Sequence, residues 1–407
     1  MNILFVSCRD IWNGIGGREN TIKSRIEYLS ENNCHCDVFY FFKNDKIFEK
    51  ENISQYSGVS TSNVTKISHS FFNVASNKKP LQYSLFYSKE NKKKLINLLL
   101  KNSYDYIVVD MIRLAPLYSL LNKYKKNAKL ILDLDDVISK RYKDIHGNVF
   151  GSFSNENKKL DKLLRFKILK KVVLSTEYRK LYKSEIYYSK LYDLCLLVNP
   201  NETNDLNKLL GNNKAYNLGL FISNEELIQK EYEKKSIFSL FFLGSLKMEQ
   251  NRSSFDNIVK NILPKISIPY KFYVVGKNDS NIVEKYSGLN SNIVFTGFVD
   301  DLNDFLLNMD IMISPIAFGT GIKTKILSAM GHGIPVITND CGANGIKCEN
   351  EKNIFIINNF DEIASKVDYL FDHQDVLESI GKNAFNLISN EYSENTFKTS
   401  LEEIRGI

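Results

Sequence analysis

Glycines and lysines occur together in one segment whose residue types suit the binding of a diphosphate. Residues 314–345 read SPIAFGTGIKTKILSAMGHGIPVITNDCGANG, a strand followed by a glycine-bearing loop and a helix. The loop residues whose backbone would meet the anion are Gly319, Thr320, Gly321 and Ile322. Glycines let N–H groups approach an anion, and the helix N-terminus adds partial positive charge. Lys323 and Lys325, in the first turns of that helix, would add ammonium groups. An ordinary strand-to-helix turn with solvated lysines fits the same pattern.

Three carboxylates form a second candidate group. Asp133, Asp135 and Asp136 end a predicted strand. They could hold a divalent metal, make polar contacts with a substrate, or have a structural role. Side chains alternate along a strand, so Asp133 and Asp135 share one face and Asp136 points to the other. This arrangement disfavours a shared metal ion, and we expect no metal requirement.

Composition excludes several classes of protein. The chain has 407 residues, 43% of them hydrophobic, and a net charge of +7, which is a mild excess for a nucleic-acid binder. Its 6 cysteines follow neither a disulfide framework nor a metal-binding spacing. No apolar run approaches the ~20 residues that a membrane span needs. We expect a soluble cytoplasmic protein with reduced thiols, in contact at most with the inner face of a membrane.

Excess positive charge is concentrated between residues 151 and 190. Within 158–183, leucines and isoleucines recur at helical spacing with lysines and arginines between them. This pattern predicts a cationic amphipathic helix, which could attract anionic lipid headgroups. A helix that covers its own sheet, with its lysines in water, is the alternative.

Short apolar runs alternate with amphipathic stretches from end to end, as in parallel sheets covered by helices. The predicted strands are 2–7, 37–41, 105–109, 129–133, 193–198, 238–243, 271–275, 292–296, 310–314 and 334–338. The predicted helices are 19–32, 89–101, 157–173, 252–263, 300–308, 321–331, 360–371 and 374–390. The pattern restarts near Ser236, which predicts two domains, 1–225 and 226–390, followed by a helical tail, 391–407, that packs back on the first.

The glycine-rich segment resembles a motif of a known enzyme family. The run FGTGIKTKILSAMGHGIPVIT resembles the donor-binding signature of retaining GT-B glycosyltransferases of the family 4 type, the glycosyl transferases group 1. Further motifs resemble this family in order along some 340 residues, and those in the predicted second domain are Phe242–Leu246 with Asn251, Val274–Gly276 and Phe295–Leu302. Those in the first are the glycine pair Gly16 and Gly17 and the strand end Leu132–Val137.

The resemblance implies an α/β fold of GT-B type, with two facing Rossmann-like, doubly wound parallel-sheet domains and a C-terminal helix that crosses back. It implies transfer of a sugar from a nucleotide-diphosphate sugar to a glycan or lipid-linked acceptor, without metal or another cofactor, in surface polysaccharide synthesis. The implied donor-binding residues are Gly16, Gly17, Gly244, Ser245, Asn251, Gly276, Gly319, Thr320, Gly321, Ile322 and Ser328. The implied catalytic residues are Lys325, Lys323 and Asp135, and the acceptor-side residues are Asp133, Asp136, Arg18 and His146.

Several positions depart from the family's pattern. Two glutamates are usual in the donor loop where this chain has Thr320 and Ser328, and an arginine and a lysine are usual where it has Ser245 and Asn251. Two further functions therefore stay open: a sugar-nucleotide epimerase-like GT-B enzyme, and a catalytically idle sugar-nucleotide-binding subunit. The loop NGIGGR at 13–18 lacks the third glycine of a dinucleotide fingerprint, which excludes a nicotinamide site.

Overall fold

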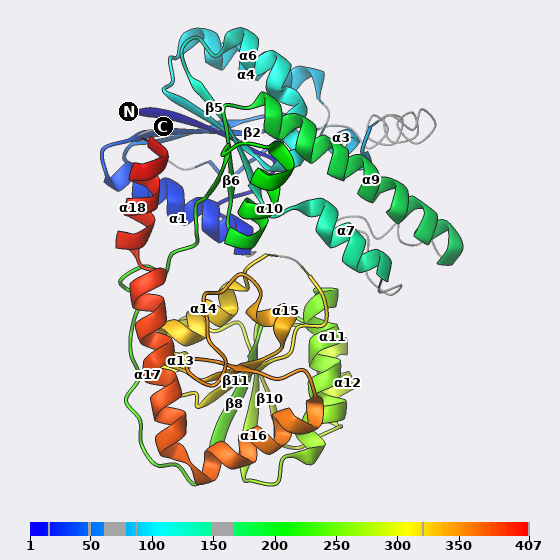
Figure 1. Ribbon diagram of the computed structural model, residues 1–407, viewed down its shortest axis with the longest axis vertical. Coiled ribbons are helices and arrows are strands. Elements are labelled where there is room, and N and C mark those ends of the chain that lie inside the picture. Colours follow the sequence, from blue (N-terminus) through cyan, green and yellow to red (C-terminus); the bar gives the residue numbers. More distant parts are fainter. Residues whose placement is uncertain are drawn as a thin grey trace. The chain divides into compact units, whose positions relative to one another are not determined.

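The chain forms two compact units, one built from Met1–Lys143 with Ile168–Leu218 and the other mainly from Gly219 onward. The computed structural model describes residues 1–14, 17–47, 50–60, 79–86, 88–147, 167–319 and 321–405. Each unit contains its own parallel sheet with helices packed on it (Figure 1). The units divide between Leu218 and Gly219, a few residues before the predicted boundary.

The first unit is built around a seven-stranded parallel sheet of order β3-β2-β1-β4-β5-β6-β7. Its strands are β1 (Asn2–Ser7), β2 (His35–Tyr40), β3 (Ile53–Ser57), β4 (Tyr106–Asp110), β5 (Lys129–Asp135), β6 (Leu194–Leu197) and β7 (Ala215–Asn217). Its helices are α1 (Gly17–Glu31), α3 (Leu81–Leu85), α4 (Lys89–Lys101), α5 (Met111–Leu114), η1 (Ala115–Leu117), α6 (Tyr118–Tyr124), α7 (Ile138–Gly147), α9 (Lys167–Leu191) and α10 (Pro200–Leu210).

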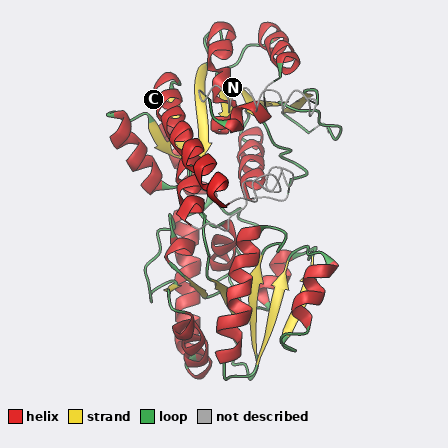
Figure 2. Cartoon of the chain, turned by 90° about the vertical axis from the view of Figure 1, so that its right-hand side faces the viewer, coloured by secondary structure: helices red, strands yellow, loops and turns green. Residues whose placement is uncertain are grey.

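The second unit has a six-stranded parallel sheet of order β10-β9-β8-β11-β12-β13. Helices lie on either side of this sheet (Figure 2). Its strands are β8 (Phe238–Leu243), β9 (Tyr270–Val275), β10 (Ile293–Gly297), β11 (Ile311–Ser314), β12 (Val336–Thr338) and β13 (Phe355–Ile356). Its helices are α11 (Glu249–Asn257), η2 (Ile258–Ile262), η3 (Leu263–Lys265), α12 (Ser280–Ser287), α13 (Leu302–Leu307), α14 (Thr324–Gly331), α15 (Asp340–Ala343), α16 (Phe360–Asp372), α17 (Gln374–Glu391) and α18 (Glu394–Arg405).

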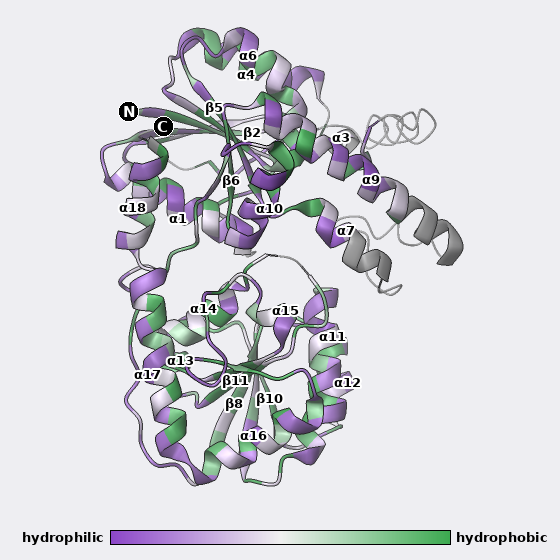
Figure 3. Cartoon of the chain, viewed as in Figure 1, coloured by the Kyte–Doolittle hydropathy of each residue, from purple (hydrophilic) through white to green (hydrophobic). Residues whose placement is uncertain are grey.

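Alternation along the strands divides the second unit's core between the two faces of its sheet. Leu240 and Phe242 of β8 face the cluster that includes α11 and α16, whereas Phe241 between them faces α14 and α17. Apolar residues accordingly follow the strands and inner helix faces, and polar residues follow the outer faces (Figure 3). Strands buried on both faces need continuous apolar runs, which explains why the sequence reveals them so clearly.

All ten predicted strands are present, with ends shifted by a few residues at most, and each unit has the predicted doubly wound parallel sheet. The sequence did not predict β3, β7 or β13, which are edge or near-edge strands with short or polar sequences. The predicted helix 157–173 begins outside the described residues, and the structure has a longer helix that runs on to Leu191. The predicted helix 321–331 begins later, at Thr324.

The segment between the units packs on the C-terminal helices. Ile222 bridges to Ser393, and the rings of Phe221 and Phe397 lie 4.6 Å apart between centroids. These contacts fix the start of α18 against the chain that leads into the second unit. Packing of the tail on the first unit stays a prediction.

Candidate functional site

The second unit has a topological switch point between β8 and β11. Chain order runs from β8 through β9 to β10 on one side, then returns to place β11 and β12 on the other. In open α/β sheets, the loops after two such strands diverge and leave a crevice at their carboxyl ends, where ligands bind. The loops concerned begin at Gly244 and Pro315, and both were identified from the sequence.

Three glycines at these strand ends hold backbone conformations that other residues rarely adopt. Gly244, Gly276 and Gly319 have φ values of 141°, 139° and 123°. A Cβ on Gly276 would lie 2.9 Å from the backbone carbon of Gly244, and one on Gly319 would lie 2.8 Å from Nε2 of Gln250. The predicted glycines therefore let neighbouring loops approach one another at the ends of these strands.

Lys325 connects the glycine loop to the end of β8. Its Nζ lies 3.1 Å from Oδ1 of Asn251 and 4.3 Å from the ring centroid of Phe242. Burial, followed by repulsion from Lys323, lowers the pKa of Lys325 to about 7. Asn251 in turn donates from Nδ2 to the carbonyl of Ser245, at 3.0 Å. An ammonium group is thus held at the switch point by a neutral partner, where an anion would stabilise its charged form.

Lys323 has a different role from its neighbour. It is the N-cap residue of α14 rather than part of its first turn, and it is buried. Its Nζ donates to the carbonyls of Gly319, at 3.3 Å, and Gly321, at 2.6 Å. These bonds close the glycine loop on itself, so the structure gives Lys323 a role in shaping the loop.

The remaining predicted donor residues lie on the same unit. Ser245 donates from Oγ to the carbonyl of Lys277, at 2.6 Å, which joins the ends of β8 and β9. Ser328 lies one turn into α14, with its carbonyl 2.8 Å from Nδ1 of the buried His332. Ile322 packs against the cluster beneath α14. Gly321 has a φ of 77°, again a glycine conformation.

The first unit has its own switch point, between β1 and β4, and a cluster of charges occupies it. Arg18 of α1 is buried with three carboxylates, 2.9 Å from Asp110 and Asp133 and 3.3 Å from Asp135. Arg25 lies about two turns further along α1, and its Nη1 is 2.9 Å from the same oxygen of Asp133. Arg18, which the resemblance places on the acceptor side, is therefore paired with carboxylates of its own unit.

Asp133 and Asp135, the two predicted aspartates of this network, have pKa values shifted in opposite directions. The two arginines lower the pKa of Asp133, although burial opposes them. Burial raises the pKa of Asp135 to about 6, although Arg18 opposes it. Asp135 also has a φ of 66° and lies at an irregularity in the β5–β6 register. Asp136 was predicted to point to the opposite face of the strand from Asp133 and Asp135. Its carboxylate indeed lies 2.5 Å from the guanidinium of Arg141, whereas Arg18 contacts Asp133 and Asp135.

Some predicted site residues lie outside the described residues. These are Gly16, Thr320 and the side chain of His146, together with 158–166 of the predicted basic helix. Gly17 is described and begins α1. Among the described residues, no group of three or more histidines, cysteines, aspartates or glutamates is placed to hold a metal ion.

Sequence reasoning did not single out three residues near these strand ends, although one of them, Phe298, lies within the motif Phe295–Leu302. Asp110 ends β4 and holds both Arg18 and the hydroxyl of Ser7, a position that the run YIVVD could have indicated. Gln250 lies against Gly319. Phe298 follows Gly297 at the end of β10 and is 69% exposed, unusual for a phenylalanine.

The chain resembles known proteins, in sequence over part of its length and in fold over all of it. Residues 238–373 match the family described as Glycosyl transferases group 1. No curated protein matches the chain by sequence. Sucrose-phosphate synthase from Thermosynechococcus elongatus has a TM-score of 0.73 at 13% identity, with 100% of this chain and 98% of that chain covered.

Two further solved structures share the fold over the whole length. HepE from Anabaena, in complex with UDP and glucose, has a TM-score of 0.68 at 13% identity, with 100% of this chain and 99% of that chain covered. A mutant of S. aureus TarM, in complex with fondaparinux, α-GlcNAc-glycerol and UDP, has a TM-score of 0.69 at 11% identity, with 100% and 99% covered.

In the described part of the chain, none of the helices is long and apolar enough to cross a lipid bilayer. The solved structures that match over the whole length show the fold. Residues 238–373, which match the family, lie in the unit that holds the glycine loop and Lys325. Residues 238–373 thus form a glycosyl transferases group 1 domain in a chain of GT-B fold, and together these findings support a transferase enzyme.

Proposed function

We propose that this protein transfers a sugar from a nucleotide-diphosphate sugar to a hydroxyl group of a glycan or lipid-linked acceptor, with retention of anomeric configuration. The observation that carries the proposal is the half-buried ammonium of Lys325, held at the switch point of the second unit beside the glycine loop. The UDP complexes of HepE and TarM make UDP the first nucleotide to test.

The chemical task is to stabilise negative charge that grows on the β-phosphate as the glycosidic bond breaks. Lys325 supplies one positive charge, and its pKa of about 7 means that a bound diphosphate would draw a proton onto it. The amides of Gly319, Gly321 and Ile322 and the N-terminus of α14 supply fixed dipoles. Because these groups are positioned before the reaction, they need little reorganisation during it. The proposal requires no metal ion.

The first unit would bind the acceptor. Asp135 is the most accessible carboxylate of its buried network, with 21% of its side chain exposed. A pKa of about 6 leaves it largely ionised at pH 7, so that it could accept a hydrogen bond from an acceptor hydroxyl. The proposal includes a role in surface polysaccharide synthesis and a cytoplasmic location at the inner face of the membrane. All six cysteines are free thiols, which supports this location.

A thermal-shift screen of nucleotide sugars, followed by a transfer assay with mixed glycan and lipid-linked acceptors, tests the proposal. We expect one nucleotide sugar to raise the melting temperature and to release its nucleotide faster when the acceptors are added. Binding without any turnover would favour the idle subunit, and isomerisation of the donor without acceptor would favour the epimerase. A chain that binds no nucleotide sugar would contradict all three.

A further inference from the structure

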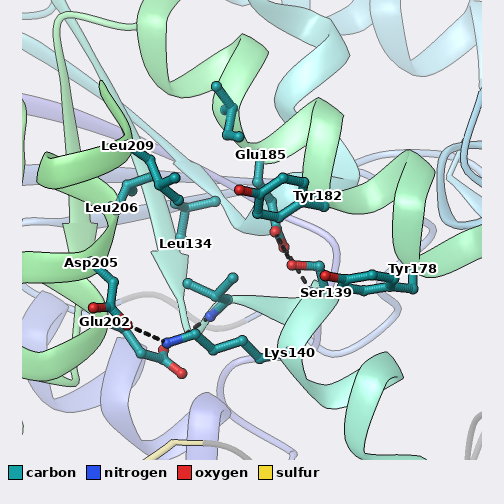
Figure 4. Close-up of a pocket in the computed structure, with 12 residues that line it drawn as sticks. Leu134, Ser139, Lys140, Tyr178, Tyr182, Glu185, Glu202, Asp205, Leu206 and Leu209 are labelled. Carbon is teal, nitrogen blue, oxygen red and sulfur yellow. Dashed lines mark hydrogen bonds and ion pairs between the residues drawn. The ribbon is translucent and has the colours of Figure 1, made fainter. Parts of the chain in front are cut away.

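A pocket of about 200 Å³ lies in the first unit, between α9, α10 and the segment that follows β5 (Figure 4). Its lining residues are Leu134, Val137, Ser139, Lys140, Tyr178, Tyr182, Glu185, Ile186, Glu202, Asp205, Leu206 and Leu209. Leu134 faces this pocket, whereas its neighbours Asp133 and Asp135 face Arg18. The pocket is therefore on the opposite side of β5 from the charge network.

Most of the lining is apolar or aromatic. Leu134, Leu206 and Leu209 gather at one end, and Tyr178 and Tyr182 of α9 form a side wall (Figure 4). The two tyrosine rings pack together, with centroids 6.2 Å apart. Leu209 is 48% exposed. A cavity of this size has room for roughly seven water molecules at ~30 Å³ each, or for several methylene groups.

The carboxyl groups in the pocket already have protein partners. Glu185 accepts hydrogen bonds from the amide and the hydroxyl of Ser139, at 3.0 and 2.5 Å. Glu202 accepts from the amide of Val137, at 3.0 Å, and Asp205 accepts from Nζ of Lys140, at 2.8 Å. Burial raises the pKa of Glu185 to about 8 and that of Glu202 to about 7, because it disfavours their charged forms. The carboxyl groups of the lining are thus held by protein partners, which leaves the leucine and tyrosine side chains to contact an apolar group.

A basic surface adjoins the pocket on α9. Arg179 and Lys183 are exposed, and each follows directly after a pocket-lining tyrosine, Tyr178 or Tyr182. Successive residues of an α-helix are rotated by about 100°, so the basic face lies next to the pocket-lining face. Tyr187, which is 58% exposed, continues the basic face one turn further on. Tyrosine with arginine and lysine is the composition that membrane–water interfaces favour.

We propose that the pocket binds the apolar chain of an anionic lipid, with the phosphate of the lipid on Arg179 and Lys183. Charge complementarity selects an anionic headgroup, and the leucine and tyrosine lining selects the chain. A prenyl phosphate that carries an acceptor sugar and a membrane phospholipid share this chemistry. The site binds without any bond being made or broken, and it does not depend on transferase activity.

Calorimetry with the full chain tests the site, with decyl phosphate as the probe. Inorganic phosphate and decanol serve as head-only and chain-only comparisons. We expect decyl phosphate to bind at least about tenfold more tightly than either. Filling the pocket by Ile186→Trp should weaken decyl phosphate binding at least about tenfold, and Leu206→Phe is a smaller second filling variant. Leu100→Trp is the matched control, because Leu100 is 59% exposed on α4 and lines no part of the pocket.

The headgroup contact is tested by Arg179→Ala with Lys183→Ala, which should weaken decyl phosphate binding and leave decanol binding unchanged. Lys93→Ala with Lys101→Ala, two exposed lysines of α4, is the control. Decyl phosphate that binds no better than inorganic phosphate, or equally well to a folded filling variant, would overturn the proposal. Equal binding by the double alanine variant would overturn the headgroup assignment. Competition by phosphatidylglycerol vesicles would identify a membrane lipid, and its absence a single-chain phosphate.

Discussion

The ammonium of Lys325 lies 3.1 Å from the side-chain oxygen of Asn251 and directly over the ring of Phe242. This contact brings together the end of β8 and the start of α14, the two elements on either side of the switch point. A lysine held by an amide oxygen and an aromatic ring keeps its charge available to an incoming anion. Lys323, two residues earlier, instead donates hydrogen bonds to the carbonyl oxygens of Gly319 and Gly321.

Replacement of Lys325 should reduce turnover without unfolding the protein. We expect Lys325→Ala to lower kcat by about 10²-fold or more, because a charge that stabilises the leaving phosphate is lost. Lys366→Ala is a matched control, because Lys366 is also half-buried, with its Nζ 4.9 Å from the ring centroid of Phe355. Steady-state kinetics at saturating donor measure the effect. Near-normal kcat in Lys325→Ala would remove this residue from the mechanism.

Substitution of Gly319 should damage the loop. A methyl group at Gly319 would meet Gln250, and a φ of 123° strains any other residue. We expect Gly319→Ala to weaken nucleotide-sugar binding about tenfold or more, as judged by calorimetry. Gly288→Ala is the control, because Gly288 has a φ of −81° and nothing within 4 Å of an added Cβ. Equal affinity in both variants would show that the loop does not contact the donor.

The aspartates of the first unit should respond in opposite ways to neutralisation. Asp133→Asn should cost roughly 3–5 kcal/mol of unfolding free energy, because it leaves buried Arg18 and Arg25 short of a charged partner. Asp135→Asn should increase stability at pH 8, by up to about 2 kcal/mol, because it removes a carboxylate whose ionised form burial disfavours.

The pH dependence separates these two effects. The folded-state pKa of Asp135, about 6, is above its ordinary value of 3.8, so this group costs stability as pH rises through 6. The advantage of Asp135→Asn should therefore shrink between pH 8 and pH 5. The pKa of Asp133 is lowered, so its contribution is lost only as pH falls below 3.8, and the cost of Asp133→Asn should be equal at pH 8 and pH 5. Urea titrations at both values measure this, and a constant gain for Asp135→Asn would contradict the assignment.

Much of the fold could be predicted because buried parallel strands are continuous apolar runs. The strands missed, ISQYS of β3, AYN of β7 and FI of β13, are too polar or too short to show that signal. Glycine-loop residues were found because they lie together in sequence. The Arg18 network was not found because its hydrogen bond to Asp110 spans 92 residues, a distance that no local pattern encodes. The difference in role between Lys323 and Lys325 depends on where α14 begins.

Proton uptake by Lys325 on donor binding tests the central claim most directly. NMR of lysine side chains can follow the titration of Lys325, identified by loss of its signal in Lys325→Arg, with and without the nucleotide sugar found by the thermal-shift screen. We predict a pKa near 7 in the free protein, raised by at least about one unit in the complex, because an adjacent diphosphate stabilises the ammonium. A pKa that stays unchanged when the donor saturates the protein would contradict the placement of the diphosphate at Lys325.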